Sequence, residues 1–176
     1  VLEEIGKDEE HNAVIKERRN GQGAEVAGVT VEGKVAYLSL VQLQAGVTWQ
    51  KSHYTRPEKW SKDSSVPAEK RIFRTPDWYG YFTATYSPVK PLNIALSGTY
   101  TGSMIVQHMK GYIPKDMAVT TPDFFDMNLK ISYDFSLYKF ITLQLNAGVQ
   151  NIFNAYQRDF DQGKERDSGY IYGPSM

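Results

Sequence analysis

Three histidines are the residues of this sequence best suited to metal binding or to proton transfer near neutral pH. His11, His53 and His108 lie far apart, and none has a second histidine four residues away, the spacing that places two metal ligands on one helical turn. The sequence also has no arrangement of nucleophile, base and orienting group of the kind that hydrolysis needs. We therefore expect three solvated loop histidines, with no metal site, no cofactor and no enzymatic reaction.

A second group of ionisable residues lies near the end of the sequence. Its acidic members alternate with basic ones, and they do not follow the residue order of the twelve-residue calcium loop. We expect a surface loop in which these charges balance. The group consists of Arg158, Asp159, Asp161, Lys164, Glu165, Arg166 and Asp167.

Two expected loops contain the residues that could contact a solute. Residues 55–75 carry a surplus of three positive charges, which could attract an anionic solute. Residues 107–123 are more apolar and could rest against a hydrophobic solute. For the basic stretch, attraction to lipid phosphates or ordinary solvation is an open alternative. The candidate contact residues are Arg56, Trp60, Arg71, Arg74, Met109 and Tyr112.

These loops connect segments in which apolar and polar residues alternate. Residues 125–135 have the clearest pattern, FDMNLKISYDF. A period of two indicates an extended strand, whose successive side chains point to opposite sides of a sheet. The same pattern predicts six strands, at residues 24–37, 41–54, 76–87, 92–106, 124–135 and 140–153.

The predicted connections are alternately short and long, which is typical of an all-β antiparallel meander that runs up and down. Residues 1–23 are highly charged and predict a loop with a strand end near residues 14–18, although a short helix is an alternative. Residues 154–176 predict a further loop.

Composition excludes several classes of protein. Twenty basic residues balance twenty acidic ones, so no global charge favours nucleic acid. The mean hydropathy is −0.47, and no run approaches the roughly 20 apolar residues of a membrane-spanning helix. Membrane proteins built from strands pass this test, because alternation halves their apparent hydrophobicity.

The apolar side of the predicted strands has the features of a surface in contact with lipid. Pairs of aromatic residues eight positions apart, such as Trp78 with Tyr86, would span roughly 20 Å of membrane. The opposite side carries mainly Gln, Asn, Thr and Ser, which suits a wet or plugged lumen. A soluble β-sandwich that acts as a binding module or adhesin is the alternative. The residues expected to face lipid are Leu43, Val47, Trp78, Phe82, Tyr86, Leu92, Ile94, Leu96, Tyr100, Met127, Leu129, Ile131, Tyr133, Leu143 and Leu145.

Four short stretches resemble the C-terminal part of TonB-dependent outer-membrane receptors. They are NGQGAEVAGVTVEGK at residues 20–34, TPDW at 75–78, LNAGVQNIFN at 145–154 and DSGYIYGPS at 167–175. Each is short, but their order and spacing cover about 150 residues of the chain.

The resemblance implies a piece of a 22-stranded transmembrane β-barrel in the outer membrane of a Gram-negative bacterium. It implies active uptake of a scarce, bulky solute, such as an iron–siderophore, haem or cobalamin, with energy from TonB. Family members also have a plug domain and a TonB-binding motif, which we expect upstream of this segment, and a last strand, which we expect after Met176. A passive porin is a further alternative.

Overall fold

The structure is a computed structural model that describes residues 2–8, 13–18 and 23–174. Within these ranges the chain forms eleven β-strands. The described residues include no helix with the length and apolar character needed to cross a membrane. In residues 1–23, where we expected a charged loop with a strand end, β1 (Leu2–Asp8) pairs antiparallel with β2 (Ala13–Arg18).

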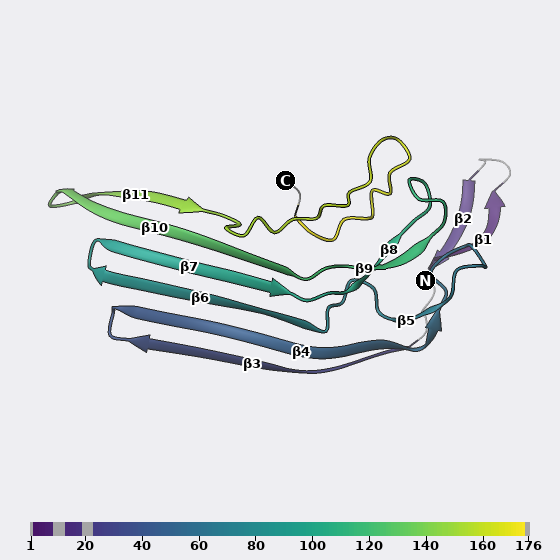
Figure 1. The fold of residues 1–176 in the computed structure, drawn as a ribbon, viewed down its shortest axis with the longest axis horizontal. Helices are drawn as coiled ribbons and strands as arrows, with labels where there is room; N and C mark the ends of the chain where they lie inside the picture. Colours follow the sequence, from purple (N-terminus) through teal and green to yellow (C-terminus); the bar gives the residue numbers. More distant parts are fainter. Residues whose placement is uncertain (1, 9–12, 19–22, 175–176) are drawn as a thin grey trace.

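A single seven-stranded antiparallel sheet dominates the structure (Figure 1). Its strands follow one another in space in the order of the chain, except that the short β5 pairs only with β4. The prediction of an all-β antiparallel meander is therefore confirmed. The strands are β3 (Ala24–Tyr37), β4 (Val41–Glu58), β5 (Glu69–Arg71), β6 (Trp78–Val89), β7 (Leu92–Thr101), β10 (Phe124–Tyr138) and β11 (Ile141–Val149).

Tight turns connect β3 to β4, β6 to β7 and β10 to β11 at one end of the sheet, whereas longer loops lie at the other end (Figure 1). In the described residues β3 pairs only with β4, and β11 pairs only with β10. The sheet is therefore open, and no closed barrel is present in the described residues.

Two expected strands end earlier in the structure than the sequence pattern predicts: β11, expected at residues 140–153, ends at Val149, and β7 ends at Thr101. We expected residues 92–106 to form one strand, but β7 ends at Thr101 and residues 105–108 form the separate strand β8. Gly102 allows the change of direction, since a Cβ at this position would lie 2.7 Å from the carbonyl oxygen of Trp78. The amide of Gly102 donates to that oxygen over 2.8 Å. Gly102 is therefore still bonded to the first residue of β6, and the chain leaves the sheet after it.

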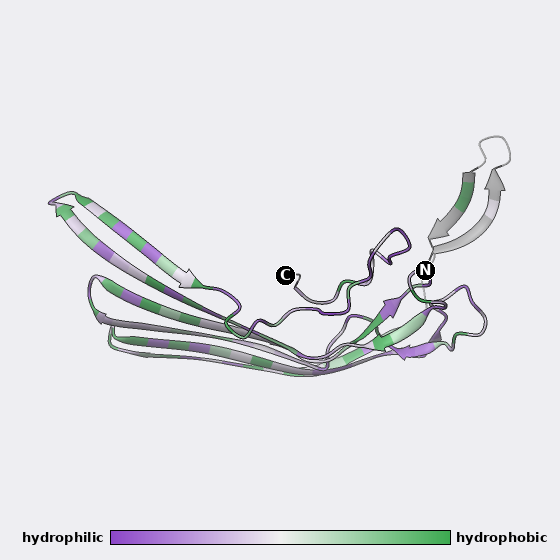
Figure 2. Ribbon diagram, turned by 45° about the horizontal axis from the view of Figure 1, so that its top comes forward, coloured by the Kyte–Doolittle hydropathy of each residue, from purple (hydrophilic) through white to green (hydrophobic). Residues whose placement is uncertain are grey.

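The pairing register assigns each side chain to one of two faces, because residues directly opposite each other in antiparallel strands point to the same side. One row of partners is apolar across six strands, and the adjacent row is polar across five. The apolar row is Val35, Leu43, Ala84, Leu96, Leu129 and Val149, and the polar row is Lys34, Gln44, Thr83, Ser97 and Asn128. We call these two sides of the sheet the apolar face and the polar face, and Figure 2 shows the resulting alternation of hydropathy along the strands.

All fifteen residues that we expected to face lipid lie on the apolar face. In the described sheet, no Asp, Glu, Lys or Arg lies on this face between the Val29–Trp49 pair near the loops and the Phe135–Leu143 pair near the turns.

No described strand covers the apolar face, since every pair of strands in extensive contact is a hydrogen-bonded pair. Leu143 is 46% exposed and Trp78 is 51% exposed, while Leu96 and Leu129 are half-buried by neighbours in the same sheet. The fully buried apolar residues in the described part of the chain, Ile105, Val106 and Tyr170, lie outside the sheet. The hydrophobic core is therefore among the loops.

Candidate functional site

Three segments at the loop end of the sheet pack together, and we call them the loop cluster: residues 59–77, 102–123 and 150–174. The second segment contains a hairpin of β8 (Ile105–His108) and β9 (Met117–Thr120). Thr121 closes the base of this hairpin, since its amide donates to the Met104 carbonyl over 2.8 Å and its hydroxyl accepts from the Met104 amide over 3.1 Å. These two bonds hold the strands of the hairpin together, and the third segment packs against this hairpin.

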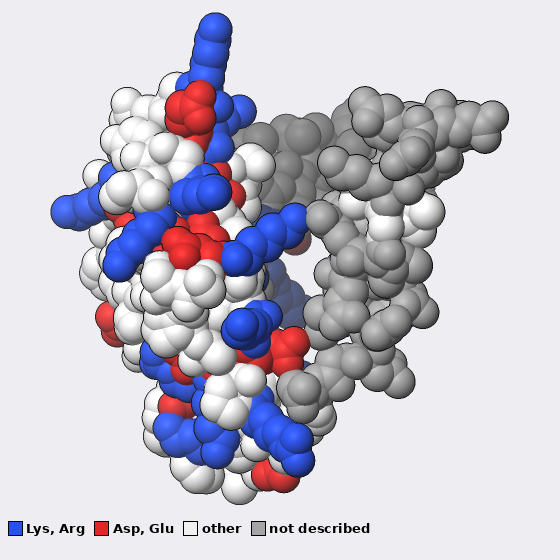
Figure 3. Space-filling model, turned by 90° about the vertical axis from the view of Figure 1, so that its right-hand side faces the viewer, with Lys and Arg blue, Asp and Glu red and all other residues white. Residues whose placement is uncertain are grey.

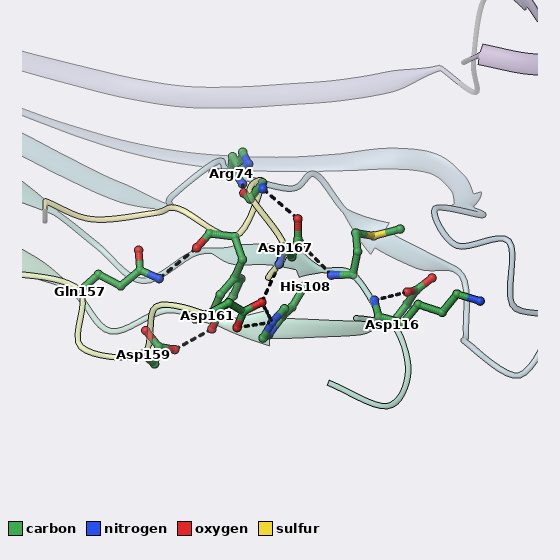
Figure 4. Close-up of polar contacts among 11 residues, drawn as sticks. Arg74, His108, Asp116, Gln157, Asp159, Asp161 and Asp167 are labelled. Atoms are coloured by element: carbon green, nitrogen blue, oxygen red, sulfur yellow. Dashed lines mark hydrogen bonds and ion pairs between the residues drawn. The ribbon is translucent and has the colours of Figure 1, made fainter. Parts of the chain in front are cut away.

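His108 joins the hairpin to the third segment (Figure 4). Its Nε2 donates to the carboxylate of Asp161, 2.9 Å from Oδ2 and 3.0 Å from Oδ1. The Asp161 side chain is only 2% exposed, and its Oδ2 also accepts from the amide of Asp167 over 2.9 Å. The expectation of a solvated histidine is wrong for His108, and that of a charge-balanced surface loop is wrong for Asp161, because the ring and the carboxylate satisfy each other inside the loop cluster. His11 lies outside the described residues, whereas His53 is half-buried at the loop end of β4, with Nε2 3.3 Å from Glu25 Oε2.

Tyr170, which stacks on His108, shares one carboxylate with Tyr172. The hydroxyl groups of Tyr170 and Tyr172 both donate to Asp159, the first over 2.7 Å. Burial raises the pKa of Tyr172 to about 12, and the hydrogen bond to Asp159 acts in the same direction. Burial would raise the pKa of Asp159, but the hydrogen bonds from Tyr172 and Tyr170 outweigh it, so this pKa lies below its ordinary value. The tyrosines therefore stay protonated and Asp159 stays ionised over the neutral range.

Gln157 is the polar residue around which the third segment folds back. Its side chain is 2% exposed, and its Nε2 donates to the Tyr170 carbonyl over 3.1 Å while its Oε1 accepts from the Tyr172 amide over 2.9 Å. A buried carboxamide that is satisfied on both sides specifies one register between residues 157 and 170–172. No spacing in the sequence indicated this role.

Arg74 connects all three segments of the loop cluster. Its amide donates to the Ile105 carbonyl over 2.8 Å, and its guanidinium donates to the carbonyls of Ile171, over 2.7 Å, and Gly169. Its φ of 59° is in the left-handed region, which a non-glycine residue adopts only where its surroundings hold it. Arg74, a candidate for solute contact, is thus engaged in holding the loops together.

Asp116 organises the loop that connects β8 to β9. Its Oδ2 accepts from the Ser61 hydroxyl over 2.5 Å, and its Oδ1 accepts from the Lys110 amide over 2.7 Å. The hydrogen bond from Ser61 is the main reason that the pKa of Asp116 is lowered, and the bond from Lys110 adds to it. This carboxylate ties the first loop segment to the second.

The other candidate contact residues lie on separate parts of the loop cluster. Arg71 lines a cavity of about 230 Å³ with Trp78 and Tyr100, whereas Trp60 lines a second cavity of the same volume with Asp116 and Met117. Arg56 is exposed near the end of β4, Met109 is half-buried beside Asp167, and the side chain of Tyr112 is 55% exposed. The structure does not bring these residues into one pocket.

The polar face has its own side-chain network. The Tyr81 ring lies across Gly46, where a Cβ would be 2.7 Å from its Cε1 atom. Its hydroxyl donates to Glu32 Oε1 over 3.0 Å and accepts from Gln44 Nε2 over 3.2 Å. Tyr81 therefore bridges β6, β4 and β3. A groove of about 680 Å³ is lined by Ser97, Asn128, Lys130 and Asn146 of this face, and also by apolar residues that include Leu129 and Val149.

Among the described residues, no group of three or more His, Asp or Glu side chains could hold a metal ion. Comparison of the chain with models of known protein families found no match, and comparison with curated proteins found none either. The findings establish an all-β antiparallel meander with many exposed apolar side chains, and they identify no family.

Proposed function

We propose that this sheet is part of the wall of an outer-membrane β-barrel transporter of a Gram-negative bacterium. The proposed protein takes up a scarce, bulky solute, such as an iron–siderophore, haem or cobalamin, with energy from TonB. The observation that carries the proposal is the apolar face, which is exposed, free of charge and continuous across six strands.

The magnitude of the hydrophobic effect supports lipid as the environment of this face. A large aliphatic or aromatic side chain left in water forgoes about 1.5–3 kcal/mol relative to full burial. Even at half that value, fifteen such side chains would forgo more than about 10 kcal/mol, which is comparable to the whole net stability of a typical domain. Contact with hydrocarbon chains removes this cost.

Aromatic residues at both ends of the apolar face support the same environment. Trp49, Trp78 and Tyr100 lie toward the loop cluster, whereas Tyr86 and Tyr133 lie toward the turns. Trp and Tyr favour the membrane interface, where the ring is in a partly apolar region and the polar atom reaches water. The two aromatic groups would therefore mark the two interfaces.

The edges and the polar face suggest what completes the wall. Unpaired backbone groups on the outer edges of β3 and β11 have no partner in hydrocarbon, so further strands would close the barrel around the polar face. A plug domain and TonB are the protein partners of the proposed transporter, and the resemblance of residues 20–34 and 145–154 to TonB-dependent receptors supports them. A passive porin would have a similar wall but no plug.

Lipid-dependent quenching of tryptophan fluorescence tests the membrane position of the apolar face. The chain has three tryptophans. Trp49 and Trp78 lie on the apolar face, and Trp60 lies in the loop cluster, where its indole donates to the Pro67 carbonyl. In single-tryptophan variants of the full-length protein in bilayers, brominated lipid should quench Trp49 and Trp78 strongly and Trp60 weakly. Equal, weak quenching at all three positions would contradict the proposal and favour the soluble β-sandwich.

A further inference from the structure

Acidic and basic side chains of the loop cluster differ in where they point. The three segments contain ten Lys and Arg residues, and every one is exposed. They also contain nine Asp and Glu residues, of which Asp123, Asp159 and Glu165 are exposed as whole residues, while Asp77 has a 43% exposed side chain that pairs with Lys51. Basic residues of this region outnumber acidic ones by one in the sequence, but by seven among the residues that are exposed.

The carboxylates lie inward because the loops use them as hydrogen-bond acceptors. Asp116 accepts from Ser61 and Lys110, and Asp161 accepts from His108. Asp167 accepts from the amides of Met109, over 2.7 Å, and Gly169, over 2.8 Å. Short acceptor side chains are well suited to bind amides in irregular backbone, whereas a long lysine keeps its charge in water. The internal structure of the loops therefore leaves their outer surface cationic.

Figure 3 shows the loop end of the molecule, where Lys and Arg side chains project over much of the described surface. Some of the basic groups have partners, since Arg74 binds two carbonyls and Arg71 Nε lies 3.6 Å from Glu69 Oε1. Lys110 and Lys115 are exposed on the β8–β9 hairpin. The pKa of Asp63 is lowered mainly by hydrogen bonds from Ser65, and the positive charges of Lys110 and Lys115 add to this effect. Lys164 and Arg166 are exposed on the third segment. Basic residues from separate loops thus share one end of the molecule.

We propose that this cationic surface captures a soluble, multiply charged anion that carries several carboxylate, phosphate or phenolate groups. This inference rests on the proposed function and assigns the transported solute to an anionic class. Charges of one sign on a surface raise the local concentration and the association rate of an oppositely charged ligand. Flexible lysines on three segments can adjust to several anionic groups at once, whereas a neutral solute would gain nothing from them.

Binding of inositol hexakisphosphate, a soluble polyanion, to the full-length protein in neutral lipid tests the inference. The variant Lys110→Glu/Lys115→Glu should weaken binding by about tenfold or more at low salt. A second variant in another segment, Lys164→Glu/Arg166→Glu, should act in the same direction. The matched control, Lys90→Glu/Lys139→Glu, changes net charge equally at the exposed turns on the opposite end and should leave the Kd within about twofold.

Two results would overturn the inference while leaving the proposed function intact. One is the absence of inositol hexakisphosphate binding by protein whose Trp49 and Trp78 are quenched by lipid, and the other is an equal loss of affinity in loop-end and turn-end variants. Vesicles that contain phosphatidylglycerol distinguish a second source of phosphate. If loop-end variants lose binding only to these vesicles and retain it to the soluble probe, the surface binds lipid headgroups and the inference is wrong.

Discussion

The imidazole of His108 lies flat against the ring of Tyr170, with 3.7 Å between the ring centroids and 7° between the ring planes. His108 belongs to the β8–β9 hairpin, and Tyr170 lies 62 positions later in the third segment of the loop cluster. Both side chains are buried, and the carboxylate of Asp161 accepts a hydrogen bond from the imidazole. This contact makes the two segments one structural unit, and it can be tested by substitution.

Replacing His108 should release the third segment. In His108→Ala, Asp161 loses its side-chain partner while it is buried, which should cost the local structure about 1–3 kcal/mol. Hydrogen exchange of residues 157–172 should accelerate, and trypsin should cleave faster at Arg158 and Lys164. His53→Ala is the control, because His53 lies on β4 and pairs with the exposed Glu25. Equal protection of the segment in both variants would contradict the proposed link.

Stability of the loop cluster should fall at alkaline pH. The pKa of Tyr172 is raised in the folded state to about 12, from an unfolded value of about 10. Its contribution to stability is therefore complete below about pH 10 and is lost as the pH rises through about 12. Denaturant unfolding across this range should show a smaller decline for Tyr172→Phe than for the wild type. Tyr112→Phe, at an exposed position, should behave like the wild type.

On the acid side, Asp159 makes the opposite contribution. Its pKa is lowered in the folded state, so the stability that it provides is present above the unfolded value of about 3.9 and is lost as the pH falls below it. Acidification should therefore weaken the hydrogen bonds that Tyr170 and Tyr172 donate to Asp159. Amide hydrogen exchange at Tyr170 and Tyr172 should then become faster. In Asp159→Asn this acid-dependent change should be smaller. An unchanged acid response in the variant would show that another group controls it.

Gly98 leaves space for an aromatic ring on the apolar face. The Phe82 ring lies over Gly98, and a Cβ at this position would overlap the ring, so Gly98→Ala should destabilise the sheet by about 1–3 kcal/mol. Gly33→Ala is a matched control on the same face, because a Cβ at Gly33 has no neighbour within 4 Å. Unfolding of the full-length protein in urea should separate the two variants, and equal midpoints would contradict the packing.

Charges introduced on the two faces should have different effects on membrane assembly. An arginine near the membrane centre costs about 2–4 kcal/mol on the lipid side of a barrel strand. Leu129→Arg should therefore strongly reduce the folded fraction in the outer membrane, as measured by heat-modifiable gel mobility, whereas Ser132→Arg on the polar face should be tolerated. Ser132 is a better control than Asn128, because Asn128 Oδ1 accepts from the Asn151 amide over 2.9 Å. Equal losses would indicate that the apolar face is a protein core.

The sequence alone predicted the sheet well because the signal is local. Alternation in residues 125–135 depends only on neighbouring residues, and the observed β10 continues it through Leu129 and Ile131 to the turn. The departure of the chain at Gly102 was missed because alternation continues through Met104 and Val106 after the chain has left the sheet. Periodicity identifies a strand but not its partner.

The loop cluster could not be predicted for a different reason. His108 and Asp161 are 53 positions apart, and Arg74 and Ile171 are 97 apart. Nothing in the composition of these loops indicates which donor meets which acceptor, so a buried histidine looks like a solvated one. Asp116 and Gln157 were overlooked because single carboxylates and carboxamides in loops are common and have no distinctive spacing.

The meander has a consequence for how the molecule assembles. Each main strand pairs only with strands adjacent to it in the chain, so each hairpin can form and then dock on the preceding edge as soon as its residues are available. The bonds of Arg74 and His108 instead need residues 161–171, which follow β11 in the sequence. Pairing of the strands from β3 to β11 should therefore precede formation of the bonds that hold the loop cluster together.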